Sequence, residues 1–204
     1  MEPAMSQPQR KLTVEDYEHF PENDGKRHEL IDGEQVVTAA PFVPHQLLLR
    51  DLFVAVHEVV EERRLGMVLF APVDVELSRH DVLQPDLLFV SKQRMHIVSR
   101  RRFHAAPDLA VEVLSASTRR LDELRKRARY EKFGVQELWI VDPPIDAIRV
   151  YRRAAETEPF GRVVQLTAAA GEALESPLLP GFSLSLSAFF AVTKDFPDDA
   201  LEGS

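Results

Sequence analysis

Two acidic residues lie in apolar runs with the length and composition of buried β-strands. Asp86 directly precedes the apolar residues 87–90, and Glu112 lies inside the run 109–114. Burying a carboxylate is costly unless it has a partner. A divalent metal ion is one such partner, because Mg²⁺ takes oxygen ligands and commonly binds one or two carboxylates. The other interpretation is structural, with Asp86 in an edge turn and Glu112 paired with an arginine. The two residues alone favour neither interpretation.

The length of 204 residues suits one domain with its own core. We expect a flexible N-terminus at 1–11, a single domain at 12–191 and an acidic flexible tail at 192–204. No apolar stretch is long enough to cross a bilayer, and the N-terminus lacks the apolar core of a signal peptide. The chain has no cysteine, which excludes disulfides and cysteine-bound zinc. We therefore expect a soluble, cytoplasmic protein that does not contact a membrane.

Hydrophobic periodicity predicts helices on both sides of a mixed sheet, which is an α/β (α+β) architecture. The Asp32-Gly33 pair favours a hairpin at 29–37. The predicted helices are 13–19, 45–64 (stopped by Gly66), 118–133 and a short one ending near 190. The predicted strands are 67–77, 82–90, 109–114, 137–142, 148–152 and 162–166.

The net charge of −8 argues against a surface that binds nucleic acid everywhere. The segment 100–132 is different, because its ten Lys/Arg and five Asp/Glu give it a net charge of +5. A basic band on an acidic body can direct a polyanion to one place. A solvated helix face is the alternative, and charge alone favours that alternative.

Lys126 lies on the predicted helix 118–133 that directly follows the strand of Glu112. Asp122, Lys126 and Tyr130 recur every fourth residue and therefore share one helix face. An ammonium near a metal site can orient a water or offset charge in a transition state. A simple salt bridge from Asp122 to Lys126 is the alternative, and on its own it is the better interpretation.

Two further residues are candidates with open roles. Glu29 is either an additional ligand of a metal or water, or an exposed strand acid, and His45 opens the long helix as a cap or a proton carrier. Other chemistries lack their usual signals: no two histidines are four residues apart, and there is no phosphate-binding glycine loop and no G-x-S-x-G.

The ordered set of motifs resembles the bacterial Uma family of candidate endonucleases, within the PD-(D/E)XK nuclease superfamily. The resemblance covers about residues 12–190. It rests on ELIDGE at 29–34, PHQ at 44–46, APVDV at 71–75, QPDLLFV at 84–90, APDLAVEVLS at 106–115, ELWIVDP at 137–143, and on Lys126 and Tyr130.

This resemblance implies a restriction-endonuclease-like fold and assigns roles to single residues. Asp86 and Glu112 would be the two metal-binding acids, the backbone carbonyl of Val113 would add a ligand, and Glu29 would be an additional acid. The superfamily pattern places a lysine two residues after the second acid, where this chain has Leu114. Lys126 on the following helix would take its place.

We therefore expect an endonuclease that uses Mg²⁺ or Mn²⁺ to hydrolyse DNA, with Glu29, Asp86, Glu112 and Lys126 at its catalytic site. The alternatives are a module of the same fold that binds nucleic acid or a partner with little catalysis, and a nuclease that cuts RNA. We also expect a homodimer, formed through apolar positions near 148–166 or through Phe189-Phe190.

Overall fold

A mixed six-stranded sheet forms the centre of the computed structural model, which describes residues 10–21, 24–115, 118–155 and 157–194. Its strand order is β10-β9-β8-β7-β6-β3, with β7 and β8 parallel and the other neighbours antiparallel. These strands are β3 (Gly66–Phe70), β6 (Leu87–Ser91), β7 (Leu109–Val113), β8 (Glu137–Asp142), β9 (Ala147–Arg152) and β10 (Val164–Thr167).

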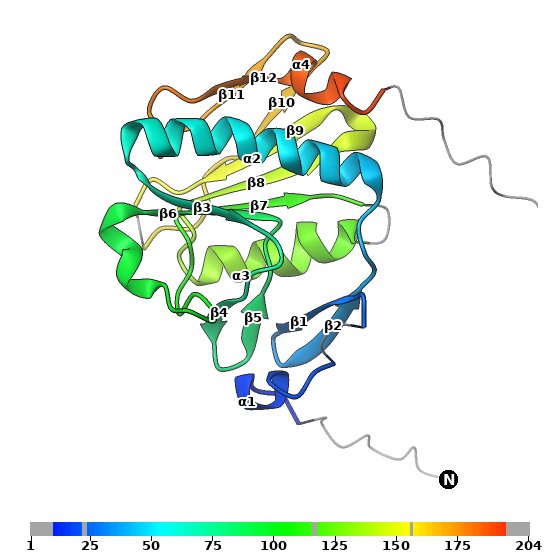
Figure 1. The fold of residues 1–204 in the computed structure, drawn as a ribbon, viewed down its shortest axis with the longest axis vertical. Helices are drawn as coiled ribbons and strands as arrows, with labels where there is room; N and C mark the ends of the chain where they lie inside the picture. The colour runs from blue at the N-terminus through cyan, green and yellow to red at the C-terminus, as the bar shows by residue number, and fades with distance from the viewer. Residues whose placement is uncertain (1–9, 22–23, 116–117, 156, 195–204) are drawn as a thin grey trace, which may run out of the picture.

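Helices cover both faces of this sheet (Figure 1). The long helix α2 (Val43–Arg63) packs on one face, where Leu52 and Val56 meet Val111 and Trp139. On the other face, a π-helical segment η2 (Leu121–Lys126) continues into α3 (Arg127–Lys132). The short helices and remaining strands are α1 (Val14–Tyr17), η1 (Lys92–Ile97), η3 (Pro143–Ile145), α4 (Leu186–Ala191), β11 (Ala173–Glu175) and β12 (Ser183–Ser185).

A second, four-stranded sheet lies at the end of the molecule that carries α1 (Figure 1). Its order is β2-β1-β5-β4, formed by β1 (Arg27–Ile31), β2 (Glu34–Thr38), β4 (Val75–Ser78) and β5 (Asp81–Leu83). The predicted hairpin is confirmed: Asp32 and Gly33 have φ of 55° and 77°, as the two-residue turn between β1 and β2 requires.

The two long strands predicted at 67–77 and 82–90 are wrong as single strands. Each is two strands, one in each sheet: β3 and β4 in the first case, β5 and β6 in the second. Pro72 and Pro85 interrupt them, because a proline has no amide hydrogen to donate to a sheet ladder. Where these two segments pass from one sheet to the other, the Ala71 N–H donates to the Asp86 carbonyl at 2.9 Å. Asp86 therefore lies at the junction of the two sheets.

Other predictions need smaller corrections. The long helix ends at Arg63, with Arg64 in the left-handed conformation (φ 53°), so the predicted stop Gly66 begins β3 instead. The prediction missed the short β11–β12 pair. Phe189 and Phe190 are buried in the core and so do not offer a dimer face. The predicted N-terminal region and acidic tail fall mostly on 1–9 and 195–204, outside the described residues.

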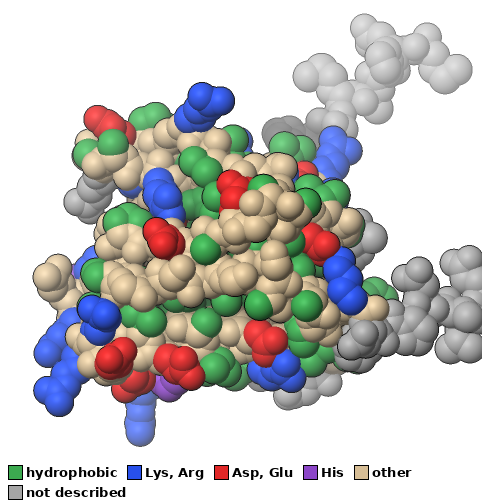
Figure 2. Space-filling view, turned by 90° about the horizontal axis from the view of Figure 1, so that it is seen from above, with side chains coloured by type: hydrophobic (Ala, Val, Ile, Leu, Met, Phe, Trp, Pro, Cys, Tyr) green, Lys and Arg blue, Asp and Glu red, His purple; other side chains and the backbone are tan. Residues whose placement is uncertain are grey.

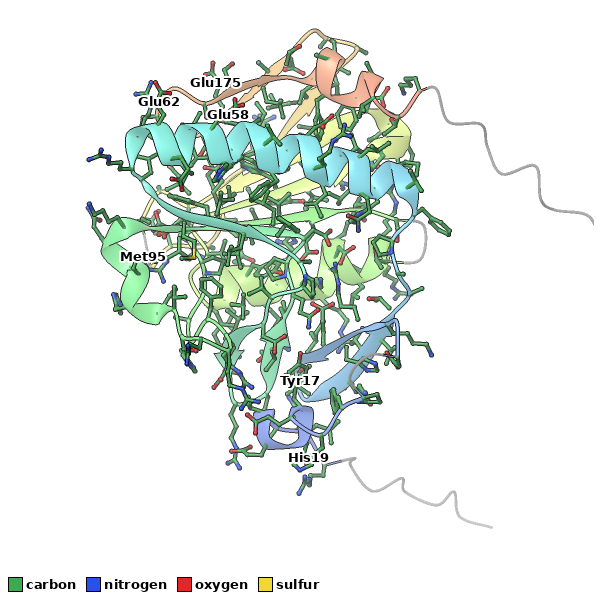
Figure 3. The ribbon with its side chains drawn as sticks, in the orientation of Figure 1. Tyr17, His19, Glu58, Glu62, Met95 and Glu175 are labelled. Carbon is green, nitrogen blue, oxygen red and sulfur yellow. The ribbon has the colours of Figure 1, made fainter. Side chains whose placement is uncertain are left out.

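The end of the molecule away from α1 has a mixed surface. Figure 2 shows Lys/Arg and Asp/Glu side chains interspersed on this face rather than gathered by sign. Figure 3 places Glu58, Glu62 and Glu175 near this end, whereas Tyr17 and His19 lie at the α1 end. No helix within the described ranges is long and apolar enough to cross a membrane.

Gly66 is required by the pairing of β3 with β6. A Cβ placed on Gly66 would lie 2.0 Å from the Val90 carbonyl oxygen, which is part of the neighbouring backbone. We expect Gly66→Ala to lower the free energy of unfolding by at least about 2 kcal/mol, measured by urea denaturation. Gly161→Ala is the control, because its Cβ would meet only the Arg152 carbonyl oxygen at 3.4 Å. Equal stability of the two variants would contradict this account of the strand pairing.

Candidate functional site

The register of β6 and β7 brings Asp86 and Glu112 to the same face of the central sheet. Leu87 pairs with Val111 in this antiparallel ladder, so Asp86 stands opposite Glu112 one residue further along. Residues directly opposite each other on antiparallel strands point to the same side. Both acids line one cavity of about 290 Å³. The sequence prediction that these two carboxylates converge is therefore confirmed in its geometry.

Asp86 is buried and has three partners. Its Oδ1 accepts from Arg27 Nη2 at 2.8 Å, while its Oδ2 lies 3.2 Å from His45 Nε2 and accepts from the Val113 N–H at 2.8 Å. Burial alone would raise the pKa of Asp86. The hydrogen bond from His45 and the positive charge of Arg27 outweigh burial, so the pKa lies below its ordinary value. Asp86 is therefore held as an anion.

Glu112 is bound by the helix that crosses beneath its strand. Lys126 Nζ donates to both carboxylate oxygens of Glu112, at 3.1 and 3.0 Å, and the Tyr130 hydroxyl donates to Oε1 at 2.5 Å. Lys126 is 1% exposed, so this contact is made without bulk water. Leu114 packs in the core on the same side of β7. Position 114 is thus apolar and buried, and the amine beside Glu112 is that of Lys126.

Glu29 reaches the same cavity from β1 in the smaller sheet. Its Oε1 lies 3.0 Å from Lys126 Nζ and accepts from the Gln84 N–H at 2.7 Å. Lys126 thereby joins the acid of the small sheet to the acid of the large sheet. The junction of the two sheets is the place where all four predicted residues, Glu29, Asp86, Glu112 and Lys126, come together.

The helix geometry adds Asp122 to the site. The predicted helix is π-helical from Leu121 to Lys126, a form that is often found at functional sites. Asp122 is buried, with its Oδ1 3.7 Å from Lys126 Nζ. The salt bridge proposed as the simple alternative therefore exists, but it is one of three contacts between Lys126 and carboxylates.

Acidic groups outnumber cations in this site. Four buried carboxylates line the cavity, against the charges of Lys126 and Arg27. Burial, together with the charges of Asp122, Asp86 and Glu29, raises the pKa of Glu112 well above its ordinary value despite Lys126. The pKa of Lys126 is also raised, because the three carboxylates outweigh the effect of its burial. The site is thus short of positive charge, and Lys126 keeps its proton.

A bound divalent cation would supply the positive charge that these carboxylates lack. Mg²⁺ is held by one or two carboxylates plus other oxygens and retains several waters, and Asp86, Glu112 and the Val113 carbonyl are the residues that suit it. In addition, the buried His45 Nδ1 at the edge of the cavity has no hydrogen-bond partner among the described residues, which suits a group that binds a water or ligand. Within the described ranges, however, no group of three His, Asp or Glu side chains is already arranged to bind a metal ion.

Sequence reasoning missed Arg27 and left His45 without a role. The signal for Arg27 was available, because it is two residues before Glu29 on a strand and so faces the same side. His45 contacts Asp86, which lies 41 residues later in the sequence, and no local pattern predicts such a contact.

The basic band is less available to a polyanion than its sequence suggests. Arg102, Arg119 and Arg129 all pair with acids of this chain. Arg125 and Arg127 pair with Glu34 and Glu131. Ion pairs within the chain therefore engage these arginines, which is neither a free basic band nor a purely solvated helix face.

Asp122 yields a prediction about stability. Burial raises its pKa to about 6 from 3.8, so the folded chain retains a proton that the unfolded chain releases. The free energy of unfolding should therefore fall as pH rises from about 4 to about 6. We expect Asp122→Asn to lessen this fall, to which Glu112 also contributes, and to stabilise the chain at pH 7.5 by up to about 3 kcal/mol, measured by urea denaturation in EDTA. Asp51→Asn, on a partly exposed part of α2, is the control. A loss of stability at pH 7.5 in Asp122→Asn would contradict the assignment.

Comparisons with known proteins identify the fold and the family of the chain. A solved structure of a protein described as a putative nuclease belonging to DUF820, from Anabaena variabilis, superimposes with a TM-score of 0.73 at 19% identity, over 88% of this chain and 98% of that chain. At this identity the likeness shows the fold. Comparison with curated proteins gives no match. The family model Uma2, described as "Putative restriction endonuclease", matches residues 14–187, and the chain therefore belongs to the Uma2 family.

Proposed function

We propose that this chain is a Mg²⁺-dependent endonuclease that hydrolyses phosphodiester bonds in DNA. The observation that carries the proposal is the set of four buried carboxylates around one ammonium, in a cavity open to a ligand. A site of this kind is expensive to bury and gives the fold no stability that apolar residues would not give. Membership of the Uma2 family, whose model is described as "Putative restriction endonuclease", supports this reaction class.

Asp86 and Glu112, with the Val113 carbonyl, hold the metal in this proposal, and Mn²⁺ would serve in place of Mg²⁺. When bound, such an ion polarises a phosphate oxygen and lowers the pKa of a coordinated water. The chain's own residues do the rest. Lys126 donates hydrogen bonds to the attacking water or to the phosphate oxygens as negative charge develops. Glu29 fixes the Lys126 ammonium from the opposite side, at 3.0 Å.

Lys126 acts as a donor and not as a base. Its pKa is raised by Glu112 and Glu29, so the ammonium form persists at neutral pH. Arg27 lies beside Asp86 and lines the cavity, which suits it to meet a phosphate of the substrate.

The direct test is cleavage of plasmid and single-stranded DNA with Mg²⁺ or Mn²⁺, with RNA assayed in parallel. We expect Asp86→Asn and Glu112→Gln each to lower the cleavage rate by at least about 100-fold, with circular dichroism confirming that both variants fold. Asp146→Asn is the matched control, because Asp146 forms an exposed ion pair with Lys194 away from the cavity. Equal rates for Asp86→Asn and the unchanged chain would overturn the proposal.

Metal binding has a separate readout in thermal stability. A ligand at ten times its Kd stabilises a protein by about 1.4 kcal/mol, which raises the Tm of a chain of this size by about 3–5 °C. We expect Mg²⁺ to raise Tm in the unchanged chain and in Asp146→Asn but not in Glu112→Gln. The same rise in all three proteins would place the ion elsewhere.

One observation favours a second candidate, a binding module of the same fold without catalysis. Lys126 and Tyr130 already engage both carboxylate oxygens of Glu112. An ion must compete with this internal network. Calorimetry with Mg²⁺ separates the two candidates. A heat of Mg²⁺ binding that the unchanged chain shows and Asp86→Asn lacks supports the nuclease. No heat of binding in the unchanged chain supports the module.

A further inference from the structure

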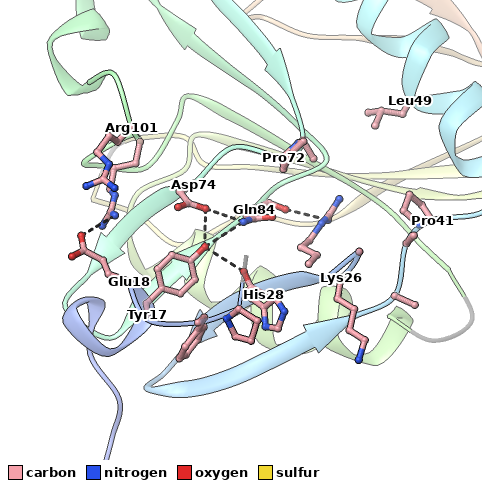
Figure 4. A pocket seen from close by; sticks show the side chains of 18 of the residues that line it. Tyr17, Glu18, Lys26, His28, Pro41, Leu49, Pro72, Asp74, Gln84 and Arg101 are labelled. Atoms are coloured by element: carbon pink, nitrogen blue, oxygen red, sulfur yellow. Dashed lines mark hydrogen bonds and ion pairs between the residues drawn. The ribbon is translucent and has the colours of Figure 1, made fainter. Parts of the chain in front are cut away.

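A larger cavity, of about 630 Å³, adjoins the acidic site. Figure 4 shows it between α1, the small sheet and the segment that leads into α2. Both cavities are lined by Arg27 and by residues 39–41, so they are neighbours along one wall. Gln84 links them: its N–H donates to Glu29 of the acidic site, while its side chain lines the larger cavity. The volume lies in the range of about 300–1,000 Å³ that is usual for ligand pockets.

The larger cavity is electropositive although the chain carries a net charge of −8. Its lining has four cationic side chains against the acids Glu18 and Asp74: Lys26, Arg27, Arg101 and Arg102. Arg27 and Arg102 are already paired with acids. For Lys26 and Arg101 there is no ion pair within the described part of the chain. Figure 4 shows these two cations on opposite sides of the cavity. A ligand that carries phosphate is the chemistry that matches them.

Aromatic and amide groups also line this cavity. The rings of Tyr17 and Phe20 meet edge to face, with their centroids 5.2 Å apart. The Tyr17 hydroxyl donates to Asp74 Oδ1 at 2.8 Å, and the Gln84 amide donates to the same oxygen at 2.8 Å. Burial and the charge of Asp74 raise the pKa of Tyr17, so its hydroxyl remains a donor. Aromatic faces with carboxylate and amide groups are the side chains that stack on nucleobases and read their edges.

We propose that the larger cavity binds a single unpaired nucleotide of the strand to be cut, next to the phosphate that enters the acidic site. This inference rests on the proposed function and names its substrate class. Lys26 and Arg101 contact flanking phosphates, and the Tyr17 and Phe20 rings contact the base. Arg27, shared by the two cavities, contacts the phosphate between them.

The base has to be unpaired because a paired base is not accessible to this lining. Inside a duplex both faces of a base are stacked on neighbours, and taking it out costs energy that a single strand does not require. The structure therefore assigns single-stranded or frayed nucleic acid as the preferred substrate.

The first experiment measures binding without metal, by calorimetry on the full chain in EDTA. The probes are 2′-deoxynucleoside 5′-monophosphates, 2-deoxyribose 5-phosphate and inorganic phosphate. We expect the nucleotides to bind at least about fivefold more tightly than the sugar phosphate, because base stacking is the added contact. Equal affinity for the nucleotides and the sugar phosphate, or no nucleotide binding up to 20 mM (a test concentration of about ten times a weak Kd), overturns the inference.

The second experiment assigns the binding to this cavity. Phe20→Leu keeps an apolar side chain but removes the ring, and we expect it to weaken nucleotide binding at least about fivefold while leaving sugar-phosphate binding unchanged. A single-stranded oligonucleotide carries the flanking phosphates, and we expect Lys26→Gln and Arg101→Gln each to weaken its binding about threefold. Arg162→Gln is the control. Arg162 lies on the exposed loop before β10 and does not line the cavity, so its loss should leave nucleotide, sugar-phosphate and oligonucleotide binding unchanged. Equal losses in Arg162→Gln and Arg101→Gln overturn the assignment.

The third experiment compares a single-stranded oligonucleotide with its duplex, by fluorescence anisotropy in EDTA. We expect the single strand to bind more tightly, and Phe20→Leu to abolish most of the difference. Tighter binding of the duplex overturns the inference. Because no cleavage is measured, a chain that binds nucleotides but does not cut contradicts only the proposed nuclease. A chain that cuts but shows no binding here contradicts only this inference.

Discussion

The burial of the Lys126 ammonium among Glu29, Glu112 and Asp122 is the interaction on which the site depends. All three contacts lie within 3.7 Å, and Lys126 is 1% exposed. Removing this ammonium would leave buried carboxylates without their cation, which typically costs about 3–5 kcal/mol. The same ammonium joins the small sheet, the central sheet and the helix beneath them, so the two sheets are held together through a charge rather than through apolar contact alone.

The crossing of the chain between the sheets explains why the site lies where it does. The segments around Pro72 and Pro85 leave one sheet and enter the other side by side, and Asp86 follows the second proline. Backbone groups between the two sheets do not take part in hydrogen bonds between strands, so they can bind side chains instead. The Gln84 N–H and carbonyl do so, with Glu29 and Arg27 as their partners. A short stretch of chain thus builds the acidic cavity on one side and lines the electropositive cavity on the other.

The distribution of charge follows from this arrangement. Most cations of the basic segment are used in ion pairs that hold the molecule together, as with Arg129 on Asp32 and Asp81. In the larger cavity, Lys26 and Arg101 are the lining cations without an ion pair in the described part of the chain, and they belong to segments far apart in sequence. An acidic protein can in this way present a small positive cavity beside a site rich in carboxylates.

The sequence by itself determined most of the local elements and a short set of candidate site residues. The Asp32-Gly33 turn, the helix from about 45 to 64 and the strands 109–114 and 137–142 follow from turn chemistry and periodicity. Asp86, Glu112 and Lys126 became candidates through residue type and position, and received their expected roles from the family resemblance. The tertiary structure alone decided that two apparent strands divide between two sheets, that Arg27 and His45 meet Asp86, and that a second cavity opens beside the first. These features arise from contacts between residues about 40 to 60 positions apart, as in Arg27 with Asp86. Periodicity reports only which face of its own element a residue occupies, and it carries no information on which distant element will cover that face.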